Sequence, residues 1–111
     1  MKDWTVYANH VLDACDKLRR IRERGDPESD EILYDAVLRN LQTLFESTAR
    51  LPEEAKSRHE SIPWRQLTGM RNILVHDYLG EIDPVTVLDV VDNRLGELES
   101  AVRSMLYEES S

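Results

Sequence analysis

One stretch near the middle of the 111-residue chain decides the fold: Gly69-Met70-Arg71-Asn72-Ile73-Leu74-Val75-His76-Asp77-Tyr78. Its apolar residues recur at helical steps, and the pattern runs out toward Gly80, which favours a helix end there. Pro63 precedes the stretch and suits a first helical turn. We therefore expect a helix from Trp64 to about residue 77 or 79, with reactive side chains gathered near its end.

Amphipathic helices are also expected on both sides of this stretch. Apolar residues recur at three- and four-residue steps in three further segments, residues 3–24, 29–50 and 83–105. Residues that can cap a helix stand at their starts: Asp3, Ser29 or Asp30, and Asp83. Pro52 favours a short additional helix over 53–59. With no period-two alternation, the sequence predicts one all-α domain over residues 1–111, an antiparallel four-helix bundle with an extra short helix.

The charge and the cysteine content limit the classes of function. A formal net charge of −8 argues against simple electrostatic binding of nucleic acid. Residues 77–111 hold most of this negative charge, so a basic cluster over 17–24 could still attract phosphate. The simpler interpretation of that cluster is a solvated, arginine-rich helix face. No apolar run approaches the roughly 20 residues that span a bilayer. Cys15, the single cysteine, cannot form an intrachain disulfide, so we expect a cytoplasmic protein.

The geometry of a helix separates the two most reactive side chains of the central stretch. At about 100° per residue, Arg71 and His76 point about 140° apart and do not converge on one small ligand. Either the helix unwinds near His76, or a second copy of the chain completes the site across a two-fold axis. Asn72 and His76 are four residues apart, the right spacing for a hydrogen bond that orients the imidazole.

These residue types are suited to metal-free phosphoryl transfer. The sequence has no cluster of ligands at metal spacing, no glycine-rich phosphate loop, and no evident serine or cysteine nucleophile with a base. A histidine can move a proton, and an arginine can hold a phosphodiester and the charge of its transition state. RNA carries its own nucleophile, the ribose 2′-hydroxyl. A purely structural interpretation stays open, with Arg71 in a salt bridge and His76 as the polar end of a core helix.

Three polar residues outside the stretch are also of interest. Asn40 falls close to the apolar stripe of its helix, so its amide must find partners across helices or across subunits. Glu46 lies at the edge of the same stripe and is either a site residue or an ordinary exposed carboxylate. His59 lies in a polar loop, where we expect it to be exposed to solvent.

The ordered set of motifs resembles one known family. Arg71, four residues, then His76-Asp77-Tyr78 looks like the RX4HXY motif of HepT-like toxins in the HEPN superfamily. Ile62-Pro63-Trp64 before the stretch is similar to the usual family sequence, as are residues 36–41, Glu46 and 50–52 upstream. The resemblance covers about residues 5–105. Phe45 departs from it, because relatives often carry glycine there.

The resemblance implies a homodimeric helical bundle whose motifs line a shared cleft, and a metal-independent endoribonuclease that needs no cofactor. It implies the toxin of a prokaryotic toxin–antitoxin pair, whose partner, an MntA-like nucleotidyltransferase, transfers AMP onto the motif tyrosine, Tyr78 here. Arg71 and His76 would be catalytic, supported by Asn72, Tyr78, Glu46 and Asn40. The alternative is a non-catalytic helical module that binds the nucleotidyltransferase, which the negative charge favours slightly.

Overall fold

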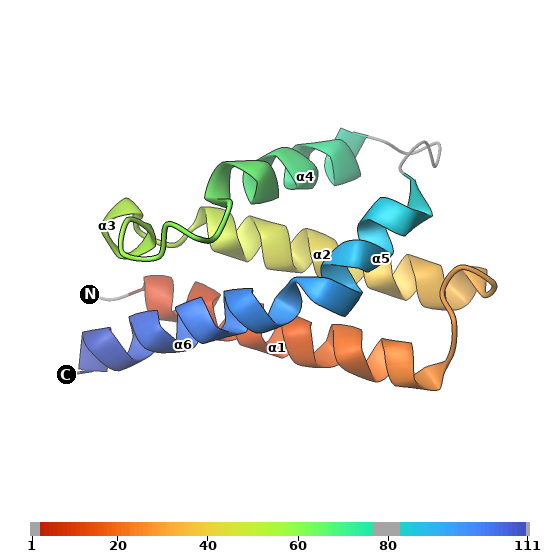
Figure 1. The fold of residues 1–111 in the computed structure, drawn as a ribbon, viewed down its shortest axis with the longest axis horizontal. Helices are drawn as coiled ribbons and strands as arrows, with labels where there is room; N and C mark the ends of the chain where they lie inside the picture. The colour runs from red at the N-terminus through yellow and green to blue at the C-terminus, as the bar shows by residue number, and fades with distance from the viewer. Residues whose placement is uncertain (1–2, 77–82, 111) are drawn as a thin grey trace.

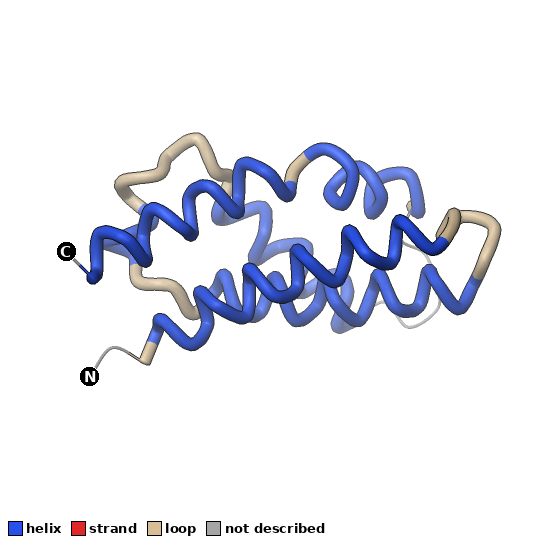
Figure 2. Tube along the Cα trace, turned by 90° about the horizontal axis from the view of Figure 1, so that it is seen from below, coloured by secondary structure: helices blue, strands red, loops and turns tan. Residues whose placement is uncertain are grey.

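The computed structural model describes residues 3–76 and 83–110, apart from the side chains of Val75 and His76. Within these residues the chain forms helices and no strand (Figures 1 and 2). In chain order they are α1 (Trp4–Arg24), α2 (Glu31–Ala49), α3 (Glu53–Lys56), α4 (Trp64–His76), α5 (Pro84–Asn93) and α6 (Leu95–Ser110). The prediction of an all-α bundle with a short extra helix is confirmed. None of the described helices is both long and apolar enough to cross a membrane.

Local capping explains where two of the helices begin. The side chain of Asp30 accepts hydrogen bonds from the backbone N–H groups of Ile32 and Leu33 at 3.0 and 3.4 Å, at the start of α2. Asp83 accepts from Val85 at 3.0 Å before α5, where Pro84 takes the first helical position. These bonds satisfy N–H donors that the helix itself cannot satisfy. The aspartates at these two positions were therefore enough to predict where the helices begin. Asp3 stands at the start of α1, but its side chain makes no capping hydrogen bond.

The last predicted helix is bent rather than continuous. It divides at Arg94 into α5 and α6, which run in different directions in Figure 1. Arg94 still donates its backbone N–H to the carbonyl of Val90 at 3.0 Å, so the chain stays helix-like through the bend. Asn93 and Gly96 flank it, and both are weak helix formers. The apolar spacing continues across the bend, which is why it predicted a single helix.

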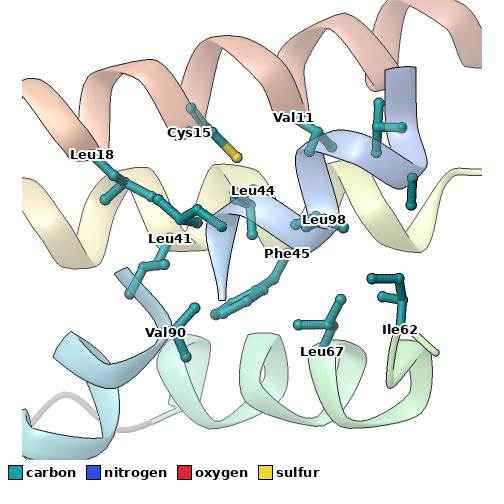
Figure 3. Packing of buried hydrophobic residues seen from close by; sticks show 14 of the residues in the cluster. Val11, Cys15, Leu18, Leu41, Leu44, Phe45, Ile62, Leu67, Val90 and Leu98 are labelled. Atoms are coloured by element: carbon teal, nitrogen blue, oxygen red, sulfur yellow. The ribbon is translucent and has the colours of Figure 1, made fainter. Parts of the chain in front are cut away.

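The core lies between α1, α2 and the bent α5–α6 unit. In Figure 3, Cys15 and Leu18 of α1 meet Leu41 of α2, while Phe45 points from α2 toward α4 and α5. All four side chains are fully buried. Cys15 is thus a small apolar core residue of α1.

Two ion pairs fasten α1 to the C-terminal helices. Arg22 donates from Nε and Nη2 to the two carboxylate oxygens of Asp92 in α5 at 2.9 and 3.0 Å, and Arg19 pairs with Glu99 of α6. This fork-like hydrogen bond from Arg22 lowers the pKa of Asp92. Arg20 pairs with Asp16 within α1. Most of the basic cluster is therefore engaged in the fold, which leaves little of it to attract phosphate.

Candidate functional site

Helix α4 carries the candidate site and is held on α2 (Figure 1). At its start, the indole N–H of Trp64 donates to the backbone carbonyls of Lys56 and His59, at 3.2 and 3.0 Å. The ammonium nitrogen of Lys56 lies 5.8 Å from the centre of the Trp64 ring, a cation–π contact. These contacts fold the loop before α4 back onto the helix. His59 is consequently only 18% exposed, so the prediction that it faces solvent is wrong.

Arg71 is half-buried on α4 and lacks a carboxylate partner among the described residues. Its Nη1 donates to Oδ1 of Asn72 at 3.4 Å. Its Nε atom is buried, and no described group accepts a hydrogen bond from it. A buried polar nitrogen without a partner carries a desolvation cost. A bound anion would remove that cost, whereas a structural salt bridge to the described residues, the open alternative, is not present.

The backbone remains helical as far as His76, the last residue of α4. Arg71 and His76 therefore lie on one helix with an unbroken backbone between them. The angle of about 140° between their side chains stays a prediction. The side chain of His76, and Asp77, Tyr78 and Gly80 entirely, lie outside the described residues. The bond predicted between Asn72 and His76 stays a prediction. The Asn72 oxygen is engaged with Arg71, which leaves its amide nitrogen as the group that could reach the imidazole.

Asn40 and Glu46 both interact within α2. The amide nitrogen of half-buried Asn40 donates to the carbonyl of Ala36 at 2.8 Å, so among the described residues this donor does not pair across helices. Glu46 is exposed and accepts a hydrogen bond from Gln42 at 3.2 Å. Neither contact excludes a second partner, because each side chain retains an unused oxygen or nitrogen.

An exposed apolar residue on α4 was not among the predicted site residues. Ile73 is 54% exposed, although it lies two positions from Arg71. On a helix it points about 200° from Arg71, outside the apolar arc that faces the core. Gly69 lies on the same outward side, and a Cβ atom built there would meet no atom within 4 Å. The sequence shows Ile73 off the buried stripe of its helix, but single exposed isoleucines are common on protein surfaces, so this pattern alone does not mark an interface.

The described residues bring no three histidine, cysteine, aspartate or glutamate side chains together in a way that could hold a metal ion. What they do bring together is a guanidinium with free hydrogen-bonding capacity, an adjacent amide, and a polar helix face that leads to His76. Such a set can bind a phosphate oxygen and orient a proton-transfer group.

Comparisons with known proteins agree with this chemistry. A family model described as ribonuclease HepT-like matches residues 11–105. A protein of Caldanaerobacter subterraneus subsp. tengcongensis, named as a candidate RNase, is 31% identical over 98% of this chain and 99% of its own length. A candidate ribonuclease HepT of Thermococcus cleftensis is 40% identical over 40% of this chain and 41% of its own.

A longer relative comes from Methanocaldococcus jannaschii. Its name combines a gamma-glutamylcyclotransferase with a candidate RNase, and it is 27% identical over 96% of this chain. The present chain spans about half of that protein, 49% of its length. No solved structure matches the chain.

Proposed function

The chain belongs to the HepT-like ribonuclease family, and from that membership we propose that it is a metal-independent endoribonuclease. His76 accepts the proton of a ribose 2′-hydroxyl while the 2′-oxygen forms a bond to phosphorus. The bond from phosphorus to the 5′-oxygen breaks, and that oxygen takes a proton from the imidazolium. The products are a 2′,3′-cyclic phosphate and a 5′-hydroxyl, so the reaction requires no cofactor.

One observation carries this proposal: the guanidinium of Arg71 is half-buried without a carboxylate partner among the described residues. Arginine is always charged and presents a planar set of donors that matches phosphate oxygens. Arg71 binds the scissile phosphate and stabilises the charge that develops on its oxygens. An arginine that served only the fold would be expected to have its donors satisfied within the chain.

The site is completed by a second copy of the chain. The backbone is helical through Arg71 and His76, so the predicted divergence of their side chains favours a two-fold cleft over an unwound helix end. Ile73, exposed, and Gly69, with open space before it, supply a surface on α4 that a second copy can cover. The cleft then gathers Arg71 and His76 of both copies.

Supporting residues hold these two groups in place. Asn72 accepts from Arg71 through its oxygen and donates to His76 through its nitrogen, so one amide couples both catalytic groups. The family resemblance adds Asn40, Glu46 and Tyr78 to the cleft. Their roles are positional, because none of them is needed as nucleophile or base in the reaction above.

The biological role that fits this activity is that of a toxin in the cytoplasm of a prokaryotic cell. A nucleotidyltransferase antitoxin neutralises it by transferring AMP from ATP to the hydroxyl of Tyr78, with release of pyrophosphate. The added AMP places bulk and negative charge where the substrate phosphate approaches, which blocks binding.

RNA cleavage in EDTA tests the activity. The wild type should cleave a single-stranded RNA, and His76→Ala should not; His10→Ala, an exposed histidine on α1, is the matched control. An inert wild type, or an active His76→Ala, contradicts the proposal and returns the chain to the alternative of a non-catalytic partner of a nucleotidyltransferase. For the modification, intact mass after incubation with the partner and ATP should rise by whole AMP units, and Tyr78→Phe should abolish the rise.

A further inference from the structure

Helix α4 leaves an apolar pocket on the flank that faces α5 and α6. The pocket has a volume of about 200 Å³. Its apolar lining includes residues from five parts of the chain, namely α2, the loop before α4, α4, α5 and α6: Leu44, Ile62, Leu67, Met70, Val90 and Leu98. Figure 3 shows Leu67 of α4 pointing into the interior that Leu98 and Val90 also line. An apolar cavity of this size accepts a side chain as large as leucine or phenylalanine.

A second hollow, the serine furrow, continues along α6. It is lined by Gly96, Ser100 and Ser104 together with His59 and Ser61, and has a volume of about 430 Å³. Residues 96, 100 and 104 are each one turn apart, so their small side chains form one row about 12 Å long. A Cβ atom added at Gly96 meets nothing within 4 Å. Packing within the chain therefore does not require glycine at position 96. A helix of another protein that packed closely on α6 would require a small residue there.

Glu97 lines both hollows, so they lie next to each other, and together they are called the groove below. Its exposed carboxylate has no ion-pair partner among the described residues, unlike neighbouring Asp89, which Asn93 and Arg94 contact. Residues 83–110 carry seven acids against two arginines. This negative charge repels RNA phosphates and favours a basic protein segment.

We propose that this groove docks an amphipathic helix of a partner protein, which inserts one apolar side chain into the pocket and places a lysine or arginine one turn away, beside Glu97. The row of small residues lets the backbone of the incoming helix lie close to α6. The apolar pocket then supplies the anchor, and Glu97 sets the orientation. Arg71 and Asn72 do not line the groove, so the interaction is separate from RNA cleavage.

A designed peptide tests the groove directly. The probe is an alanine-based helix of about 18 residues, fluorescently labelled, with one phenylalanine at its centre and lysine four residues later. Fluorescence anisotropy against the full chain should give saturable binding. Replacing the phenylalanine of the peptide by alanine, or its lysine by glutamate, should each raise the Kd about tenfold or more, which corresponds to about 1.4 kcal/mol.

Variants of the chain localise the binding. Glu97→Lys and Ser100→Leu should each weaken it about tenfold, while Glu23→Lys, the same charge change on an exposed part of α1, should not. Circular dichroism shows whether each variant is folded, and RNA cleavage should be unchanged in all three. Unaltered binding to Glu97→Lys and Ser100→Leu overturns the proposal. Displacement of the labelled peptide by phenethylamine alone also overturns it, because it indicates a small-molecule pocket. Disassembly of the protein's own dimer by the peptide overturns it too, because it assigns the groove to a second copy.

Discussion

Arg71 donates from Nη1 to Oδ1 of Asn72, the next residue of α4, across 3.4 Å. Neighbouring side chains diverge by about 100° on a helix, so they meet only because the guanidinium is long. The distance is at the far end of the hydrogen-bonding range, and the bond is correspondingly weak. A phosphate oxygen can therefore replace or extend it at little cost, which is the property a substrate-binding arginine needs.

Removing this guanidinium should abolish most of the cleavage activity. We expect Arg71→Ala to lower kcat/KM by about 100-fold or more, since it deletes a donor aimed at developing charge. Arg71→Lys should recover only part of the loss, because an ammonium cannot contact two phosphate oxygens as a fork. Steady-state cleavage of a fluorogenic RNA measures both. Arg103→Ala, which changes an exposed arginine on α6, is the control. If Arg71→Ala cleaves RNA as fast as this control, Arg71 has no part in the reaction.

A charge at Ile73 should dissociate the proposed dimer. Ile73 is exposed in the single chain, so Ile73→Glu should leave the fold intact while placing an unpaired charge in the interface. Light scattering after size-exclusion chromatography should show a monomer, and cleavage activity should fall with the dimer. Ile32→Glu changes an even more exposed isoleucine, 75% accessible at the start of α2, and should stay dimeric. An active, monomeric Ile73→Glu protein means that the site lies within one chain.

The parts of the fold that sequence predicted are those set by local physics. The capping bonds of Asp30 and Asp83 span two or three residues, so a short motif was enough to place them. The burial of His59 depends on the indole of Trp64, five residues away, which donates to the His59 carbonyl. The periodicity of apolar residues does not predict the orientation of that indole. The fork between Arg22 and Asp92 joins residues 70 positions apart, and many arginines and acids on these helices could have paired instead.

The site was predictable to a similar degree. Helical angles predict that Arg71 and His76 point apart, and the structure bears on the backbone part of this prediction, because α4 is helical through both residues. That Arg71 has no ion pair with the described residues was not predictable, because it depends on which carboxylates of other helices come near. The groove beside Met70 was not predictable either, since it forms where α4 and the bent α5–α6 unit fail to meet.

Acid should weaken the attachment of α5 to α1. The hydrogen bond from Arg22 lowers the pKa of Asp92 below its unfolded value of about 3.9. The pair therefore stabilises the fold above pH of about 4, and this contribution is lost as pH falls through the folded pKa. Both side chains are more than a third exposed, so the gain is below about 1 kcal/mol. Urea unfolding of wild type and Asp92→Asn should differ at pH 7, and the difference should shrink as the pH falls below about 4; a difference independent of pH contradicts this account.

Cys15 should be inert in the folded protein. Burial, followed by the charge of Glu99, raises the pKa of its thiol to about 12. Against an unfolded value of about 8.5, the thiolate fraction at pH 8 is smaller on the order of 1000-fold. A thiol reagent should therefore label Cys15 only in urea. The raised pKa also means that the stability it contributes is complete below pH of about 8.5 and declines toward pH 12. Fast labelling of the native chain would contradict the buried position.

Phe45 should be the side chain that holds α4 in place. It is fully buried and points from α2 toward Val90 and Leu67, so it fills the space between α4 and α5 (Figure 3). Phe45→Ala should reduce the free energy of unfolding by about 3–5 kcal/mol, and Phe45→Leu by less, because leucine leaves a smaller cavity. Ile32→Ala, at an exposed position, should change it by less than about 0.5 kcal/mol. Urea unfolding followed by circular dichroism measures all three. Cleavage activity should fall in Phe45→Ala at temperatures where the chain is still folded, since α4 carries Arg71; full activity there would show that α4 is positioned by other contacts.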